Sequence, residues 1–391
     1  MKQLISKRIR DVQPFQGRVM FEKAKALERR GEKLIHFELG EPDFDTPTHI
    51  KEAAKQALDE GYTHYAPNAG LLELREAIAE KLKKENNFEA DPLTQICVTV
   101  GSQEAAYLAI MCTIEPGDEV LITDPGYYTY KNCVKMAEGK PVMVHVKKEN
   151  GFRLLPEDLE KKITSKSKMV IINSPCNPTG TVMTRSDLQA IDELAIKYDL
   201  LVLSDEIYEK IIYDGQKHHS IAALSKEPDR IITVNGFSKA YAMTGWRVGY
   251  IVANKTLISE IIKMQQSMLS SVTTFAQKAA IAALKGPQEP LFNMLKEFER
   301  RREIIINGLN RVDGFSVTKP DGAFYAFVNV REFGKSSLEL SEYLLNEAKV
   351  VTTPGVAFGE NGEGYIRISY ATSIENIKEG LIHIQQAIEK L

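Results

Sequence analysis

The chain has 391 residues, 43% of them hydrophobic and 26% charged, with a formal net charge of −3 at pH 7. This length is too great for one simple core, so we expect two domains. The charge balance, without a long block of one sign, argues against binding to nucleic acid or to a membrane surface. No apolar stretch approaches the roughly 20 residues that span a bilayer.

The N-terminus lacks the apolar core of a signal peptide. The four cysteines, Cys97, Cys112, Cys133 and Cys176, show neither the paired spacing of a zinc site nor the density of a disulfide-rich secreted domain. We therefore predict a cytoplasmic protein that binds no metal, no nucleic acid and no membrane.

The middle of the chain alternates short apolar runs with amphipathic stretches. A helix pattern covers residues 17–31, and a later one covers residues 186–198. Alternating strands and helices favour a mostly parallel sheet covered by helices on both faces, which is an α/β fold. The apolar runs cover residues 96–100, 119–123, 141–146, 169–173, 200–204, 231–234 and 248–253.

The last third of the chain changes character. Residues 256–285 and 287–311 have the pattern of two long helices, and a final helix begins at about residue 373. Between them we expect short β-like segments at residues 315–318, 323–330, 350–353 and 365–370. We predict a large domain over residues 46–284 and a smaller α+β domain formed by residues 1–45 with 285–391.

Four of the predicted strands end in polar, sharply turning segments: TDPGYY, NSPCNPTG, SDEIY and NGFSK. Ligands of α/β sheets bind beyond the carboxyl ends of the strands. The four segments therefore predict one crevice at one edge of the sheet.

Lys239 leaves the buried strand at 231–234, and Arg247 follows eight residues later. A half-buried ammonium loses solvation, so its pKa falls and the amine becomes a nucleophile able to form a Schiff base. The Arg247 guanidinium suits a phosphate. A phosphorylated aldehyde cofactor would use both, whereas taken alone they can also be surface residues that flank a turn.

Asp205 directly follows the apolar run LLVLS. A carboxylate there can pair with the ring nitrogen of a pyridine cofactor and keep it protonated. Glu206 is the competing carboxylate, and we prefer Asp205 because it comes first after the strand. The phenol of Tyr208 and the amide of Asn177 can donate to a phenolic oxygen of such a cofactor.

Gly101, Ser102 and Gln103 form a small-residue turn that opens a helix over residues 104–114. Such a turn is a ready anion site, although an ordinary N-cap looks the same. Ser238, just before Lys239, offers another hydroxyl to a phosphate.

Two further residues have both a functional and an ordinary reading. Tyr127 can stack on a flat cofactor, with Tyr128 as the nearby alternative, but aromatic residues are usually core. Arg367 lies in the alternating strand GEGYIRISY, on the side opposite Ile366 and Ile368. If that side faces the crevice, its guanidinium can bind a carboxylate through two hydrogen bonds; otherwise it is a surface arginine.

Taken together, the segments resemble the fold-type I, pyridoxal-phosphate-dependent aminotransferases of class I, in the aspartate and aromatic branch of prokaryotes and archaea. The resemblance covers essentially the whole chain. The matching segments are LGEPDFDTP, THYAPNAGLLELREAIA, NSPCNPTG, SDEIYE, GFSKAYAMTGWRVGY, KPDGAFYAF and YIRISYAT.

The resemblance implies a mostly parallel seven-stranded sheet, the cofactor pyridoxal 5′-phosphate and a ping-pong transamination. It implies that Lys239 forms the Schiff base and moves the proton, and that Asp205 pairs with the ring nitrogen. It also implies a homodimer in which Tyr65 reaches the phosphate in the partner subunit. The other implied contacts are Tyr208 and Asn177 with the phenolic oxygen, Gly101, Ser102, Gln103, Ser238 and Arg247 around the phosphate, Tyr127 on the ring, and Arg367, Asn177 and Gly40 at the α-carboxylate.

Two positions bear on the substrate. Gln103 stands where some aspartate-specific relatives carry a lysine, and Phe15 falls in a segment that resembles the family's substrate cover. We predict broad or aromatic-leaning specificity, with glutamate and 2-oxoglutarate as the recycling pair. The alternatives are an aspartate aminotransferase, a pyridoxal-phosphate-dependent β-lyase and, outside this cofactor class, a regulatory binding module or a nucleotide-binding α/β protein.

Overall fold

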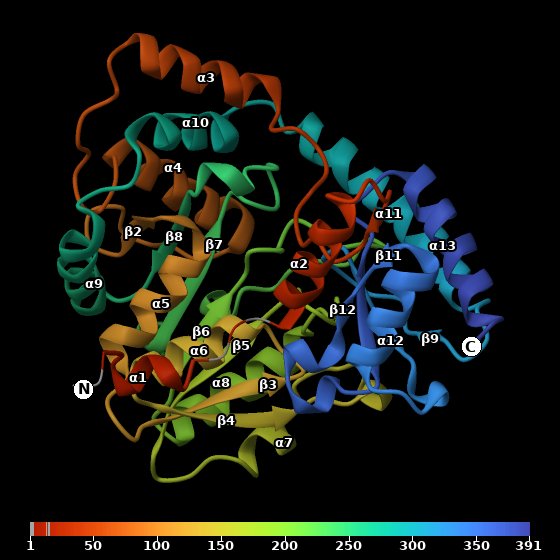
Figure 1. Cartoon of the computed structure of the whole chain (residues 1–391). Coiled ribbons are helices and arrows are strands. Elements are labelled where there is room, and N and C mark those ends of the chain that lie inside the picture. The colour runs from red at the N-terminus through yellow and green to blue at the C-terminus, as the bar shows by residue number, and fades with distance from the viewer. Residues whose placement is uncertain (1–3, 13, 15) are drawn as a thin grey trace.

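The computed structural model describes residues 4–12, 14 and 16–391 (Figure 1). At its centre is a seven-stranded sheet of order β2-β8-β7-β6-β5-β3-β4, in which only β8 runs antiparallel to its neighbours. The prediction of an α/β fold with a mostly parallel sheet is therefore confirmed. The strands are β2 (Ile96–Thr99), β3 (Glu119–Asp124), β4 (Lys140–His145), β5 (Ser167–Asn173), β6 (Leu201–Asp205), β7 (Ile231–Gly236) and β8 (Gly249–Val252).

Helices cover both faces of this sheet because its strands alternate apolar side chains between the two faces. On β5, Met169 and Ile171 pack toward one cluster, whereas Val170 and Ile172 pack toward the opposite one. The first cluster contains α5 (Gly101–Thr113), α6 (Tyr128–Met136) and α9 (Lys255–Leu269), and the second contains α7 (Pro156–Glu160) and α8 (Arg185–Lys197). Beside β2 and β8 lie α3 (Thr48–Asp59), α4 (Leu72–Lys81) and α10 (Thr274–Lys285).

The single helix expected over residues 256–285 is wrong. The structure has two helices there, because α9 ends at Leu269 and α10 begins at Thr274. Ser270 has a φ of 66°, which is left-handed and ends the first helix. Ser and Thr side chains compete for backbone partners, and the Ser271 hydroxyl accepts a hydrogen bond from the Ala66 N–H at 3.2 Å.

A second, antiparallel sheet of order β12-β13-β10-β9 lies to one side of the first (Figure 1). Its strands are β9 (Ser316–Val317), β10 (Tyr325–Asn329), β12 (Thr353–Pro354) and β13 (Tyr365–Ser369), and α11 (Glu289–Leu309), α12 (Ser337–Tyr343) and α13 (Ile374–Ile388) accompany it.

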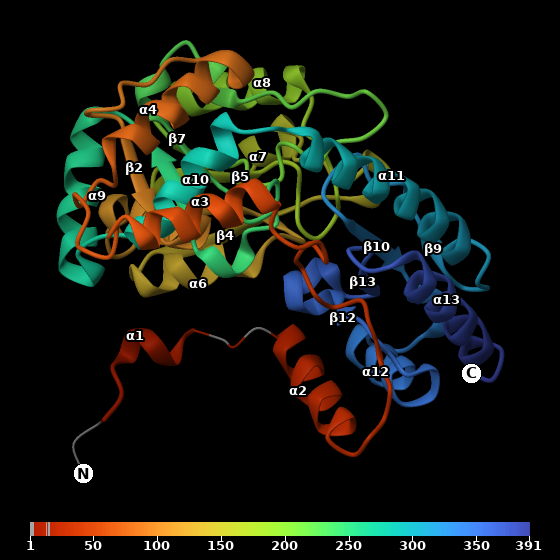
Figure 2. The same cartoon turned by 90° about the horizontal axis from the view of Figure 1, so that it is seen from above.

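The two ends of the chain meet around this second sheet. β1 (Ile35–His36) pairs in parallel with β11 (Val350–Val351), and α2 (Gln16–Glu28) buries Met20 and Ala24 against Val351. Figure 2 shows α2 beside the C-terminal elements β12 and α12. The domain boundaries at residues 45 and 284 stay a prediction.

Short helical turns complete the described chain. They are α1 (Lys7–Arg10), the π-helical turns η1 (Leu82–Asn86) and η7 (Leu344–Ala348), and the 3₁₀ turns η2 (Lys148–Asn150), η3 (Ile221–Ala223), η4 (Pro228–Arg230), η5 (Thr244–Trp246), η6 (Arg331–Phe333), η8 (Gly355–Phe358) and η9 (Glu360–Gly362). Within the residues described, no helix is both long and apolar enough to cross a membrane.

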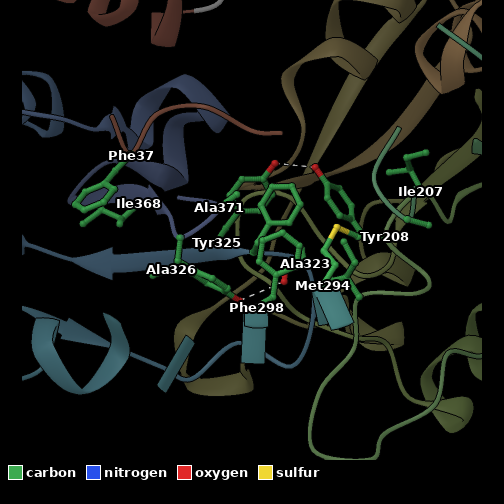
Figure 3. Packing of buried hydrophobic residues seen from close by; sticks show 14 of the residues in the cluster. Phe37, Ile207, Tyr208, Met294, Phe298, Ala323, Tyr325, Ala326, Ile368 and Ala371 are labelled. Carbon is green, nitrogen blue, oxygen red and sulfur yellow. Dashed lines mark hydrogen bonds between the residues drawn. The ribbon is translucent and has the colours of Figure 1, made fainter. Parts of the chain in front are cut away.

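Buried hydrophobic side chains from the loop after β6, from α11 and from the second sheet pack together (Figure 3). Phe298 of α11 packs on Phe324 with ring centroids 5.2 Å apart, and Tyr208 packs edge-on against Tyr325 at 5.8 Å. The hydroxyls of Tyr208 and Tyr325 share a hydrogen bond of 2.7 Å, drawn as a dashed line in Figure 3. This contact joins the loop after β6 to the start of β10, next to the cavity described below.

Candidate active site

A cavity of about 360 Å³ lies where the carboxyl ends of β5, β6 and β7 meet β10 and β13. Its volume falls in the range of small-molecule sites. The crevice predicted from the strand ends is therefore present. The predicted residues that line it are Gly40, Ser102, Gln103, Tyr127, Asn177, Asp205, Tyr208, Ser238, Lys239, Arg247 and Arg367.

Lys239 lies three residues beyond β7, and its Nζ donates a hydrogen bond to the backbone carbonyl of Gly40. Burial lowers the pKa of Lys239 to about 8, and the positive charges of Arg367 and Arg247 act in the same direction. The carboxylates of Glu41 and Asp205 oppose this shift. The amine is therefore far easier to deprotonate than an ordinary lysine.

Asp205 is the last residue of β6, and its carboxylate has two donors. The Ile207 N–H donates to Oδ1 at 3.1 Å, and the Tyr130 hydroxyl donates to Oδ2 at 2.7 Å. Burial raises the pKa of Asp205 to about 6, whereas these hydrogen bonds and the nearby Lys239 lower it. A buried carboxylate with two donors is held in one orientation.

Glu206, the competing carboxylate, is bound elsewhere. Its Oε1 accepts hydrogen bonds from the hydroxyls of Ser204 and Ser220 at 3.0 and 2.8 Å. Its Oε2 lies 2.9 Å from Nε2 of His218. Asp205 rather than Glu206 lines the cavity.

The N-terminus of α5 and Arg247 form a cradle for an anion. The helix begins at Gly101 rather than at residue 104 as expected, which places Ser102 and Gln103 in its first turn. A Cβ at Gly101 would lie 2.6 Å from Nη2 of Arg247, so the guanidinium packs directly over this backbone. The first N–H groups of a helix have no partner within it, and they attract a phosphate.

Arg367 also lines the cavity and is 4% exposed. Its Nη1 donates to Oδ1 of Asn177 at 3.0 Å, and its Nη2 donates to the backbone carbonyl of Glu38. The guanidinium carbon lies 4.4 Å from the centre of the Tyr325 ring. A buried guanidinium fixed on its sides in this way is suited to a carboxylate.

Sequence reasoning missed Tyr325 and Tyr130. Tyr325 lines the cavity, and a Cβ at Gly40 would lie 2.7 Å from its hydroxyl, so only glycine fits at position 40. Tyr325 belongs to the segment KPDGAFYAF, which was matched to the family and predicted as a strand. That match was the signal that could have identified it. Nothing in the local pattern around Tyr130 indicates its bond to Asp205.

The remaining predicted residues differ in their placement. Tyr127 and Tyr128 both line the cavity, and their rings pack edge-on with centroids 5.1 Å apart. Tyr65 lies between α3 and α4 with 89% of its surface exposed, and it is not one of the residues that line the cavity of its own chain. Phe15 lies outside the described residues.

Comparisons with known proteins give a family. The family model described as aminotransferase class I and II matches residues 32–384. An aspartate aminotransferase of Pyrococcus abyssi is 47% identical, over 99% of this chain and 98% of that protein. An aromatic-amino-acid aminotransferase 2 of Thermococcus litoralis is 45% identical over the same shares.

A solved structure, the aromatic aminotransferase from Pyrococcus horikoshii OT3, superposes with a TM-score of 0.90 at 47% identity. The superposition covers 94% of this chain and 99% of the Pyrococcus horikoshii chain. The chain therefore belongs to the class I and II aminotransferases. It is a pyridoxal-phosphate-dependent aminotransferase that acts on amino acids and 2-oxo acids.

The cavity fits this cofactor. It brings together an amine of lowered pKa, a buried carboxylate and a helix N-terminus beside a guanidinium. These groups match the aldehyde, the ring nitrogen and the phosphate of pyridoxal 5′-phosphate, respectively.

Proposed function

We propose that this aminotransferase takes a broad or aromatic-leaning set of L-amino acids and uses glutamate and 2-oxoglutarate as the recycling pair. The observation that carries the proposal is the neutral Gln103 in the wall of a cavity that Tyr127 and Tyr128 also line. An amide gives a distal carboxylate less stabilisation than a charged donor would, whereas the two rings offer apolar contact.

The names of the relatives support two readings. One relative is an aromatic-amino-acid aminotransferase, which agrees with the proposal, and several are aspartate aminotransferases, which favour the alternative substrate. The Phe15 contribution to substrate cover remains part of the proposal.

Each predicted site residue has a proposed role. When bound, pyridoxal 5′-phosphate supplies the electron sink for the carbanion at the substrate Cα. Asp205 holds the proton on the ring nitrogen, while Tyr208 and Asn177 donate to the phenolic oxygen. The phosphate is held by the first turn of α5 with Gly101, Ser102 and Gln103, and by Ser238 and Arg247, while Tyr127 covers the ring.

Substrate orientation and proton transfer fall to two basic residues. Arg367 binds the α-carboxylate, with Asn177 and the Gly40 backbone beside it. With the cofactor bound, the Nζ of Lys239 would hold its aldehyde carbon in the resting enzyme. Once the substrate amine has displaced it, the freed Lys239 amine would take the proton from the substrate Cα and deliver it to that carbon, two atoms away. A positioned base of this kind typically contributes about 10²–10⁴-fold to the rate.

We also propose a homodimer in which Tyr65 reaches the phosphate site of the partner subunit. Its side chain is 89% exposed in the single chain, as expected of a residue that a second copy covers. A cytoplasmic location fits the four free cysteines.

The test is a half-reaction screen on the purified holoenzyme. Single amino acids are added without any 2-oxo acid, and the visible absorbance of the bound cofactor is followed. We expect rapid bleaching by phenylalanine, tyrosine and glutamate and slow bleaching by aspartate, and we expect K239A to lose the reaction while keeping its fold. The exposed lysine variant K263A on α9 is the matched control.

Three outcomes would contradict parts of the proposal. Aspartate bleaching far faster than phenylalanine would replace the substrate assignment with the aspartate alternative. Release of pyruvate and ammonia without an acceptor would point to a β-lyase. Substantial activity in K239A would remove the role given to Lys239.

A further inference from the structure

In the cavity wall, a tyrosine and the proposed cofactor-pairing carboxylate are buried together. The Tyr130 side chain comes from α6 and is 2% exposed, and Asp205 at the end of β6 is 5% exposed. The Tyr130 hydroxyl donates to Oδ2 of Asp205 at 2.7 Å across 75 positions of sequence. A charge-assisted hydrogen bond of this length between buried groups is a strong one.

The protonation state of Asp205 depends on this hydrogen bond and on the charged groups around it. Burial and the like charge of Glu206 favour the protonated form of Asp205, and Lys239 and the Ile207 N–H favour the ionised form. Around the phenol lie Tyr127 and Cys176, and burial holds the pKa of Tyr130 well above its usual range, so the hydroxyl stays a donor. A donor to the charged form of a carboxylate favours that form.

The same tyrosine also supports the cavity wall. Its ring packs edge-on against Tyr127 with centroids 5.5 Å apart, and Tyr127 lines the cavity. Tyr130 also lines the cavity, so it contacts both Asp205 and Tyr127 at the site.

We infer that Tyr130 is a positioning residue for transamination: its hydroxyl holds Asp205 in the orientation and ionised state that the ring nitrogen of the cofactor needs. The inference rests on the proposed role of Asp205. The roles proposed above do not include Tyr130. Asp205 has one other donor, the Ile207 N–H.

The test is a binding titration of cofactor-free enzyme with pyridoxal 5′-phosphate, followed by fluorescence quenching at pH 6.5 and 8.5. Removal of the donor in Y130F raises the protonated fraction of Asp205, mainly at the lower pH. Because a hydrogen bond to a charged group is worth on the order of a tenfold change in an equilibrium, we expect the dissociation constant of Y130F to rise about tenfold at pH 6.5. At pH 8.5 we expect it to approach the wild-type value.

Two probes separate this role from simple packing. A deaza analogue of the cofactor, with C–H in place of the ring nitrogen, should bind Y130F and the wild type equally. In the D205N background, Y130F should have no further effect on cofactor binding. Tyr343, whose hydroxyl donates to the Ala387 carbonyl at 2.8 Å in a different part of the fold, gives the matched control Y343F.

A third variant covers the case in which Y130F does not fold. Site-specific 3-fluorotyrosine at position 130 keeps the ring and makes the phenol a stronger donor, so the dissociation constant at pH 6.5 should fall. An equal effect of Y130F on the cofactor and on its deaza analogue would overturn the inference. If D205N binds the cofactor as the wild type does, the Asp205 role fails and this inference with it; if D205N weakens binding and Y130F does not, only the inference fails.

Discussion

The lowered pKa of the Lys239 amine has the same cause as the cost of this residue to the folded chain. Its pKa is about 8 mainly because burial disfavours the ammonium form. Below pH 8 the folded and unfolded forms both carry the proton, so the full cost of burying the charge is present. Between pH 8 and 10.5 the unfolded chain binds more protons than the folded one, so this cost falls as the pH rises.

K239M should therefore stabilise the cofactor-free protein at pH 7. A shift from 10.5 to about 8 corresponds to about 3 kcal/mol in the free energy of unfolding, and the gain should shrink as the pH approaches 10.5. Urea unfolding of the cofactor-free wild type and K239M at pH 7 and pH 10 measures it. An equal gain at both pH values would mean that packing, not charge burial, separates the two proteins.

The residues that sequence could predict are those with a local signal. Asp205 directly follows an apolar run and Lys239 comes shortly after one, so their places near the strand ends could be predicted from the pattern. Tyr130 and Tyr325 could not be read in this way. Their partners Asp205 and Tyr208 are 75 and 117 positions away, and only the packing of α6 and β10 brings them together.

At the scale of elements, the strands were predicted more accurately than the helix ends. A buried parallel strand is a short apolar run, and β5 and β7 match the runs at 169–173 and 231–234 closely. The break at Ser270 was missed because the residues on both sides of it continue a helical pattern. The start of α5 at Gly101 was missed because the pattern of apolar residues does not show that a glycine with a φ of 75° begins the helix.

The start of α5 depends on a close approach to β8. A Cβ at Gly249, in β8, would lie 2.5 Å from the Gly101 carbonyl carbon and 2.6 Å from the Ser102 nitrogen. G249A must therefore push the first turn of α5 away from the sheet. Because overpacking typically costs about 1–3 kcal/mol, we expect a loss of stability of that order and a weaker affinity for pyridoxal 5′-phosphate.

Urea unfolding and a cofactor titration check the G249A prediction. The matched control is G245A, four positions earlier in the same segment, where a Cβ would meet no atom within 4 Å. Similar losses in both variants would show that helix–sheet contact is not the cause.

At the scale of the whole molecule, the cavity draws on both ends of the chain. Gly40 follows β1, which pairs with β11, and Arg367 lies in β13, whereas Lys239 follows β7 of the large sheet. The proposed dimer adds one more segment, the exposed loop that carries Tyr65. Each complete site would then consist of Lys239 from one subunit and Tyr65 from the other.

Mixed dimers test this arrangement. Y65A and K239A are each expected to be weakly active or inactive alone, because one weakens phosphate binding and the other lacks the amine. In a mixed dimer, however, the subunit with an intact Lys239 receives an intact Tyr65 from the K239A partner. One of the two sites in each mixed dimer is then complete, so the purified mixed dimer should recover about half of the wild-type turnover. The variants are co-expressed with different tags, the doubly tagged species is purified, and its turnover is measured at low cofactor concentration.

If Tyr65 instead serves its own subunit, the mixed dimer contains no complete site and turnover does not recover. A chain that sediments as a monomer would rule out the shared site altogether.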